Sequence, residues 1–325
     1  MVSRYDDVLA DVLKRQGYKA GDTLKLILPF LKAYDVTERK MQIFASKTLV
    51  LISKIRESLK FIRNTANAYI VSTSYEPYIR ALCHTVNFPF KNAFCTKVKI
   101  DSYELNKDEK FRLRRLAAEI AEMPIIEIPP GAKTLEDFSE THRQTIMRLD
   151  EIFWKEIMEM DIGRIFMEVN PVGGREKAEA VKRITEMLGV GLTDVVYVGD
   201  SITDVEAFKK VRHEGGLTLS FNGNEYAVRE AEIAIMSDKA LVTALLTEIF
   251  CKWGKEGVVK LAESWNFNSV KKLKVDPKLK SMFFYAYRER FPLVEVVKPD
   301  NMERLIREST SFRKSVRGEA VGRLG

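Results

Sequence analysis

The feature that most limits the fold of this chain is a regular alternation of short apolar segments with amphipathic ones. Apolar runs typical of buried strands occupy residues 194–199, 217–221 and 231–236, and helical patterns separate them. A strand pattern over 68–72, followed by a helical one over 76–86, repeats this form, and 164–169 reads as a further short strand. Strands joined by helices of this length pair in parallel with right-handed crossovers. The sequence therefore predicts an α/β protein with a doubly wound parallel sheet, a Rossmann-like core.

The segments around this core differ from it in pattern. Residues 1–62 repeat apolar positions at helical spacing and form a helical, cap-like region, while 63–97 and 164–245 hold the strand–helix units of the core. Between them, 98–163 reads as an inserted cap or lid with two amphipathic helices. The remaining 246–325 is predicted to be a basic helical extension packed on the outside.

Composition excludes several classes of protein. The chain has 325 residues, of which 46% are hydrophobic and 30% charged, which is typical of a globular protein and unlike a disordered one. No uncharged stretch approaches the ~20 residues of a membrane-crossing helix, and no secretory signal opens the sequence. Three scattered cysteines and three histidines do not suit a disulfide framework, a zinc site or a histidine triad. We expect a cytoplasmic protein without membrane insertion.

The net charge of +7 raises the question of an acidic partner. Much of the excess lies late in the chain, from Lys271 to Arg323. No groove-reading motif accompanies these residues, so a solvated face is the favoured interpretation and a nucleic-acid partner the less favoured one.

The stretch from Val195 to Asp204 is the most informative about chemistry. A buried strand ends in Gly199-Asp200, and Asp204 follows at the start of a helix, so both acids face the carboxyl end of the strand, where active sites of such sheets lie. Two oxygen ligands with room for water and substrate oxygens suit Mg²⁺ and phosphoryl chemistry. The structural alternative is a turn residue at Asp200 and a helix N-terminal charge at Asp204.

Two other segments reach the same edge of the predicted sheet. Ser72 and Thr73 end a strand just before a helix, where hydroxyls and amides can hold a phosphoryl oxygen or simply cap the helix. Lys177 opens the helix after the Gly173-Gly174 turn and can place an ammonium there. A solvated lysine is the alternative, and Arg175 and Lys182 compete for the role.

In this order, the three segments resemble motifs of the haloacid-dehalogenase-like (HAD) hydrolase superfamily. The sequence is more narrowly similar to an archaeal branch whose members often carry the description subunit R of energy-converting hydrogenase A, through the segments 3–7, 21–26, 72–75 and 221–227. The resemblance implies a HAD-like sheet with helical caps. It also implies phosphoryl binding by Ser72 or Thr73, charge stabilisation by Lys177, Mg²⁺ binding by Asp200 and Asp204, and weaker substrate contacts from Ser201 and Asn222.

One motif of that family is missing. Its nucleophilic aspartate ends the first strand of the sheet, and no apolar strand with an acidic end precedes Ser72. We therefore expect the first strand to be absent, either because the reading frame begins too late or because this is a degenerate copy. The intact form is expected to be a Mg²⁺-dependent phosphatase of a small phosphorylated compound, and this chain to be inactive. The alternatives are a non-catalytic accessory protein of a hydrogenase complex and a basic nucleic-acid-binding protein.

Overall fold

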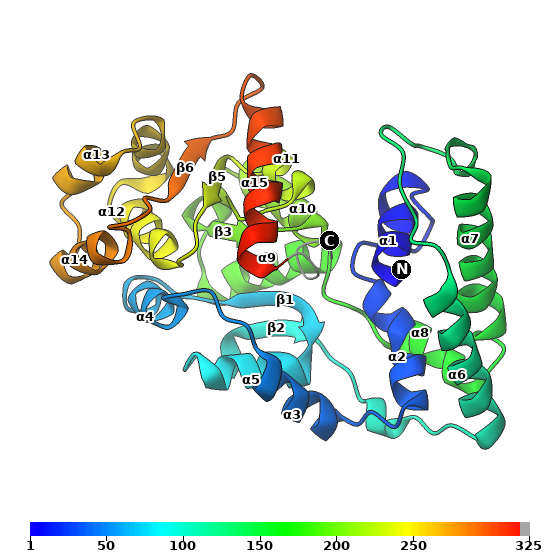
Figure 1. The fold of residues 1–325 in the computed structure, drawn as a ribbon. Coiled ribbons are helices and arrows are strands. Elements are labelled where there is room, and N and C mark those ends of the chain that lie inside the picture. Colours follow the sequence, from blue (N-terminus) through cyan, green and yellow to red (C-terminus); the bar gives the residue numbers. More distant parts are fainter. Residues whose placement is uncertain (319–325) are drawn as a thin grey trace.

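The computed structural model describes residues 1–318, so Arg323 and the rest of 319–325 lie outside it. A helical bundle on one side is joined to a mixed α/β body on the other (Figure 1). Among residues 1–318, none of the helices combines the length and the apolar character needed to cross a bilayer.

The α/β body contains two groups of strands. β1 (Ile70–Tyr75) pairs in parallel with β2 (Ala93–Thr96). The second group has the order β3-β4-β5-β6, with bounds Val196–Gly199, Leu217–Phe221, Ile233–Met236 and Leu293–Val296. The first three are parallel, as the strand–helix alternation predicts, and β6 is antiparallel. The mixed α/β class and the parallel pairing are thus confirmed.

Helices cover both faces of the four-stranded sheet. On one face, alternate residues of β4 and β5 pack on α12 (Leu241–Glu263), α13 (Phe267–Lys272) and α14 (Pro277–Ala286). On the other face lie α10 (Val205–His213), α11 (Glu225–Glu230) and α15 (Met302–Arg317). Covering on both faces explains why β5, Ile-Ala-Ile-Met, is a continuous apolar run that is buried along its length, and why the first four residues of β4 are buried although Thr218 and Ser220 are polar.

The helical bundle draws on two distant parts of the sequence. α1 (Val2–Asp7) and α2 (Thr23–Ala33) share one hydrophobic core with α6 (Lys107–Glu122), α7 (Glu140–Glu151) and α8 (Ile165–Glu168). The predicted regions 1–62 and 98–163 therefore meet in a single bundle, the cap. The rest of the first region, α3 (Glu38–Thr48) and α4 (Ile55–Thr65), lies against the α/β body, α3 on α5 (Glu76–Thr85) and α4 on α12.

Two sequence predictions about strands are wrong. The strand expected over 164–169 is helical, a short 3₁₀ turn followed by α8, because its buried residues Ile162, Ile165, Phe166 and Val169 recur at helical spacing. The extension expected to be helical contains β6, a four-residue strand at the sheet edge. So short a strand with one apolar face leaves little pattern in the sequence.

Candidate functional site

The site lies where β3 ends. Gly199 closes the strand, Asp200 and Ser201 follow, and a 3₁₀ turn over Ile202–Asp204 leads into α10. A Cβ on Gly199 would stand 2.6 Å from Asp204 Cγ, so only glycine lets the Asp204 carboxylate fold back beneath the strand end. Gly199 is thus required for packing as well as being part of the sequence motif.

Asp204 and Lys177 form a buried ion pair. Lys177 Nζ lies 2.7 Å from Asp204 Oδ1, and both residues are almost fully buried. The Tyr197 hydroxyl donates to the same oxygen at 2.8 Å, while the amides of Asp200 and Ser201 donate to Oδ2 at 3.0 and 3.1 Å. Burial opposes the charge, but the Lys177 ammonium and these donors hold the pKa of Asp204 below its usual range.

The positions of the three candidate cations, Lys177, Arg175 and Lys182, differ clearly. Lys177 lies in the first turn of α9 (Arg175–Leu188), which begins after Gly174 and ends at Gly189 in the left-handed conformation. Arg175 points to solvent, and Lys182 lies 3.8 Å from Glu186 on the exposed face. Lys177 alone of the three is turned inward, toward Asp204.

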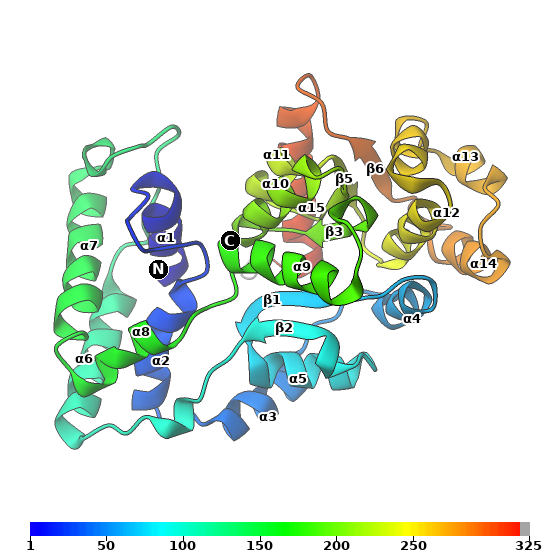
Figure 2. The same cartoon turned by 180° about the vertical axis from the view of Figure 1, so that it is seen from behind.

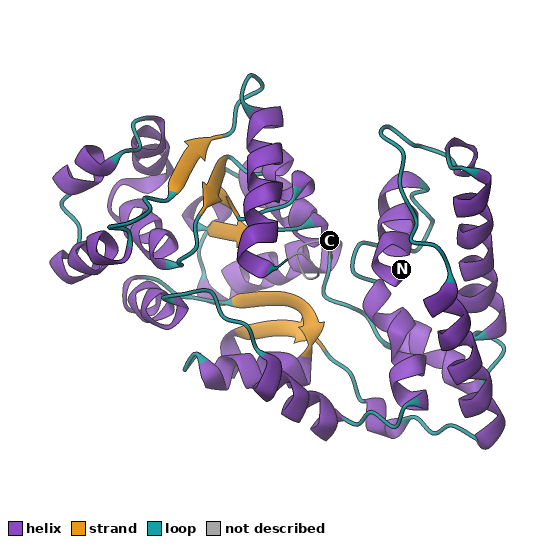
Figure 3. Ribbon diagram, viewed as in Figure 1, coloured by secondary structure: helices purple, strands orange, loops and turns teal. Residues whose placement is uncertain are grey.

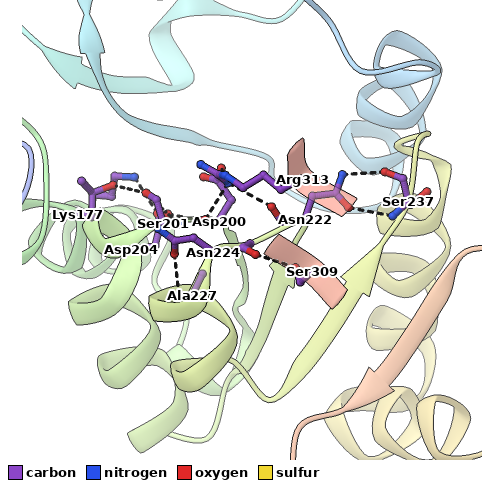
Figure 4. A network of polar contacts seen from close by, with 12 residues as sticks. Lys177, Asp200, Ser201, Asp204, Asn222, Asn224, Ala227, Ser237, Ser309 and Arg313 are labelled. Atoms are coloured by element: carbon purple, nitrogen blue, oxygen red, sulfur yellow. Dashed lines mark hydrogen bonds and ion pairs between the residues drawn. The ribbon is translucent and has the colours of Figure 1, made fainter. Parts of the chain in front are cut away.

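Asp200 has a partner that the sequence did not indicate. Arg313 of α15 places Nη1 2.6 Å from Asp200 Oδ2, 3.0 Å from the Asp200 carbonyl oxygen and 3.2 Å from that of Asn222 (Figure 4). The arginine is buried, whereas the Asp200 side chain keeps 32% of its surface exposed. Leu305, Ser309 and Arg313 are spaced four residues apart and therefore lie on one face of α15. This spacing does not show that Arg313 contacts Asp200.

Ser72 and Thr73 lie inside β1, which runs on to Tyr75, so the strand ends three residues later than the sequence predicts. Neither caps α5, because that helix begins after Tyr75 without a side-chain cap. Ser72 Oγ accepts from the amide of Ser74 at 3.2 Å. Thr73 Oγ1 is buried without a hydrogen-bond partner among residues 1–318. The Thr73 side chain lies beside Gly173, and Gly173 precedes Lys177 by four residues. Thr73 Oγ1 is therefore the buried oxygen of the two that makes no hydrogen bond within residues 1–318.

Ser201 and Asn222 hold the backbone in shape. Ser201 caps the 3₁₀ turn, with its hydroxyl 3.3 Å from Asp204 Oδ2. Asn222 takes a positive φ of 50° and exchanges two hydrogen bonds with the backbone of Ser237, at 2.7 and 2.9 Å. In this structure both predicted substrate contacts are thus engaged with the protein itself.

A loop of the cap covers the strand ends. A Cβ on Gly21 would lie 2.7 Å from Thr73 Cγ2 and 3.4 Å from Thr203 Cγ2, and one on Gly173 would lie 2.4 Å from the Ala20 carbonyl oxygen. Lys19 Nζ is 3.0 Å from Glu176, and the Tyr226 hydroxyl is 3.0 Å from Asp11 Oδ2. Cap and α/β body thus meet at the candidate site, with the small residues permitting the close approach.

The oxygen ligands present at this site are not sufficient to bind Mg²⁺. Both oxygens of Asp204 already accept hydrogen bonds from protein groups, and Asp200 is ion-paired with Arg313. Residues 1–318 contain no group of three or more acidic, histidine or cysteine side chains placed to hold a metal. A magnesium site here would need a further oxygen ligand and a displaced arginine.

Comparison with known proteins finds one informative similarity. No protein-family model and no curated protein matches the chain. Among solved structures, the chain is similar to gene product AF1437 from Archaeoglobus fulgidus, with a TM-score of 0.78 and 26% sequence identity. The match covers 100% of this chain and 88% of that chain.

Proposed function

We propose that this chain is a HAD-like phosphohydrolase scaffold that holds the phosphate-binding and charge-stabilising groups but lacks the nucleophile. The buried Lys177–Asp204 pair carries the proposal. Its ammonium lies 2.7 Å from a carboxylate whose remaining donors fix its orientation, at the end of a strand beside Asp200. An ammonium held in this way can offset the negative charge of a phosphoryl group without moving.

The roles follow from the positions of the side chains. The buried Thr73 hydroxyl can donate to a phosphoryl oxygen, and Lys177 can stabilise the charge that develops as the ester P–O bond breaks. An attacking carboxylate would form the new O–P bond, and water would later cleave that bond. The sequence offers no apolar strand with an acidic end before Ser72 to supply this carboxylate, so we expect residues 1–325 to be inert. We propose Mg²⁺ binding only for a site completed by that attacking carboxylate.

Hydrolysis of p-nitrophenyl phosphate in the presence of Mg²⁺ tests the proposal. We expect no turnover by residues 1–325, and turnover by a chain extended before Met1 with an apolar strand that ends in an Asp-x-Asp sequence. In the extended chain, Asp200→Asn should abolish turnover. Asp238→Asn is the matched control, because Asp238 follows β5, pairs with Lys239 and takes no part in the Asp200 network.

The contradicting result is an extended chain that folds with its added strand seated and hydrolyses nothing. Co-purification of that inert protein with hydrogenase subunits would then favour the accessory role.

A further inference from the structure

One nitrogen atom of Arg313 lies among three oxygen atoms at the end of β3. Its Nη1 is 2.6 Å from the Asp200 carboxylate, 3.0 Å from the Asp200 carbonyl oxygen and 3.2 Å from the Asn222 carbonyl oxygen. We call these three oxygen atoms the oxygen cradle. Carboxylate oxygens combined with backbone carbonyl oxygens are ligands that proteins use for Ca²⁺. The oxygen cradle therefore has the chemistry of a cation site, in which the arginine supplies the positive charge.

The backbone around the oxygen cradle is held in place by contacts that do not involve the arginine. Asn222 has a φ of 50°, and its side-chain amide donates to the Ser237 carbonyl oxygen and accepts from the Ser237 amide. The Asp200 carbonyl oxygen also accepts a hydrogen bond from the Asn224 amide, at 2.9 Å. We therefore expect the oxygen cradle to keep its shape when the Arg313 side chain is replaced.

α15 brings the guanidinium to this site from the far end of the sequence. Figure 3 shows the helix lying against the strands of the four-stranded sheet, and Figure 2 shows it next to α11. Leu305, Ile306 and Phe312 share a hydrophobic core with β5 and α11. The Ser309 hydroxyl, one turn before the arginine, donates to the Gly223 carbonyl oxygen at 2.7 Å. The helix is thus fixed on both sides of its inward face, and the guanidinium has a defined position.

The guanidinium and a metal ion cannot share the oxygen cradle. The Arg313 side chain is only 3% exposed, so its charge needs the Asp200 carboxylate beside it. A divalent cation bound to the same oxygen atoms would lie at contact distance from that positive charge, in a region with little solvent to screen the repulsion. Binding of a metal to Asp200 therefore requires that the arginine leave.

The dimensions of the oxygen cradle suit Ca²⁺ better than Mg²⁺. Mg²⁺ requires oxygen atoms at about 2.0–2.1 Å in a near-ideal octahedron, whereas Ca²⁺ accepts about 2.3–2.6 Å and irregular geometry. The three oxygen atoms surround Arg313 Nη1 at 2.6 to 3.2 Å, so Ca²⁺ needs the smaller inward adjustment.

We propose that Arg313 is the resident cation of the oxygen cradle and competes with divalent metal ions for Asp200. α15 thereby sets how readily the candidate site takes a metal, a regulatory role that rests on the proposed function. In residues 1–325 the arginine prevails. A second carboxylate in a completed site would raise the affinity for a metal and shift the competition away from the arginine.

Calorimetric titration with Ca²⁺ tests the competition in residues 1–325. We expect no saturable binding by the wild type at millimolar Ca²⁺, and one site in Arg313→Met with an affinity at least about tenfold higher, because a like charge has been removed. Arg313→Lys keeps a cation at this position and should bind as weakly as the wild type. Adding Asp200→Asn to Arg313→Met should abolish the gain.

Lys314→Met is the matched control for net charge. Lys314 is the next residue of α15 and is exposed, so its replacement removes the same charge away from the oxygen cradle and should create no site. Urea unfolding verifies that each variant is folded, and Ca²⁺ should raise the unfolding midpoint of Arg313→Met alone. Arg313→Gln takes the place of Arg313→Met if the methionine variant does not fold.

Three results would overturn the proposal. The first is a folded Arg313→Met, or Arg313→Gln, that binds Ca²⁺ no better than the wild type. The second is a gain that persists with Asp200→Asn, and the third is an equal gain in Lys314→Met. A larger gain for Mg²⁺ than for Ca²⁺ would overturn the size argument. None of these measurements involves catalysis, so Arg313 can be shown to compete with a metal even if the proposed reaction fails.

Discussion

Replacing Lys177 with methionine removes the cation from a buried carboxylate while keeping most of the side-chain volume. The side chains of Lys177 and Asp204 are only 8% and 4% exposed, so solvent screens their interaction little. Breaking such a pair from one side typically costs 3–5 kcal/mol. Asp204 keeps the Tyr197 hydroxyl and two backbone amides, so we expect the lower end, about 3 kcal/mol in the free energy of unfolding at pH 7.

The pH dependence gives this prediction a distinct signature. In the wild type the pKa of Asp204 is lowered in the folded state, so the carboxylate contributes stability that is present above its unfolded value, about 3.9, and is lost as the pH falls. Without Lys177, burial dominates and raises that pKa. The cost of Lys177→Met should then shrink between pH 7 and pH 5, as the carboxyl group takes up a proton.

Urea unfolding at both pH values measures the effect. Lys182→Met on the same helix is the control, because its pair with Glu186 is 3.8 Å apart and exposed, and we expect a change below about 0.5 kcal/mol. In a double-mutant cycle, Asp204→Asn should recover much of the loss caused by Lys177→Met. A loss below about 1 kcal/mol at pH 7, or one that stays constant down to pH 5, would refute the assignment of a buried ion pair.

Two further predictions concern the cap. Burial, with the neighbouring Asp6 carboxylate, raises the pKa of Asp7 to about 6. The folded state therefore binds more protons than the unfolded state between about pH 4 and 6, and its stability should fall as the pH rises through that window. Asp7→Asn should raise the free energy of unfolding by about 3 kcal/mol at pH 8 and leave it unchanged at pH 4, and an unaltered pH profile would count against this. Gly21→Ala should lower the free energy of unfolding by about 1 kcal/mol more than Gly17→Ala, because both glycines have positive φ but only at Gly21 would the new Cβ meet Thr73 Cγ2. Thr73→Ser removes that methyl group, so thermal unfolding in this background should show no difference between the two alanine variants. A difference that persists would show another cause.

The amino-acid sequence by itself determined the local parts of this protein. Apolar runs and helical periodicity were enough for β3, β4, β5 and α9, because strand burial and helix amphipathicity are written in neighbouring residues. The same local reading placed Lys177 and Asp204 at strand and helix ends that face each other.

Only the tertiary structure decided which distant segments meet. Arg313 reaches Asp200 across 113 positions of sequence, and α1 shares a core with α7, because packing joins surfaces by shape and burial, which no spacing within a segment encodes. The different environments of Asp200 and Asp204 also depend on the tertiary structure. Asp204 is enclosed by protein donors and Asp200 stays partly exposed, since burial depends on everything that surrounds a side chain.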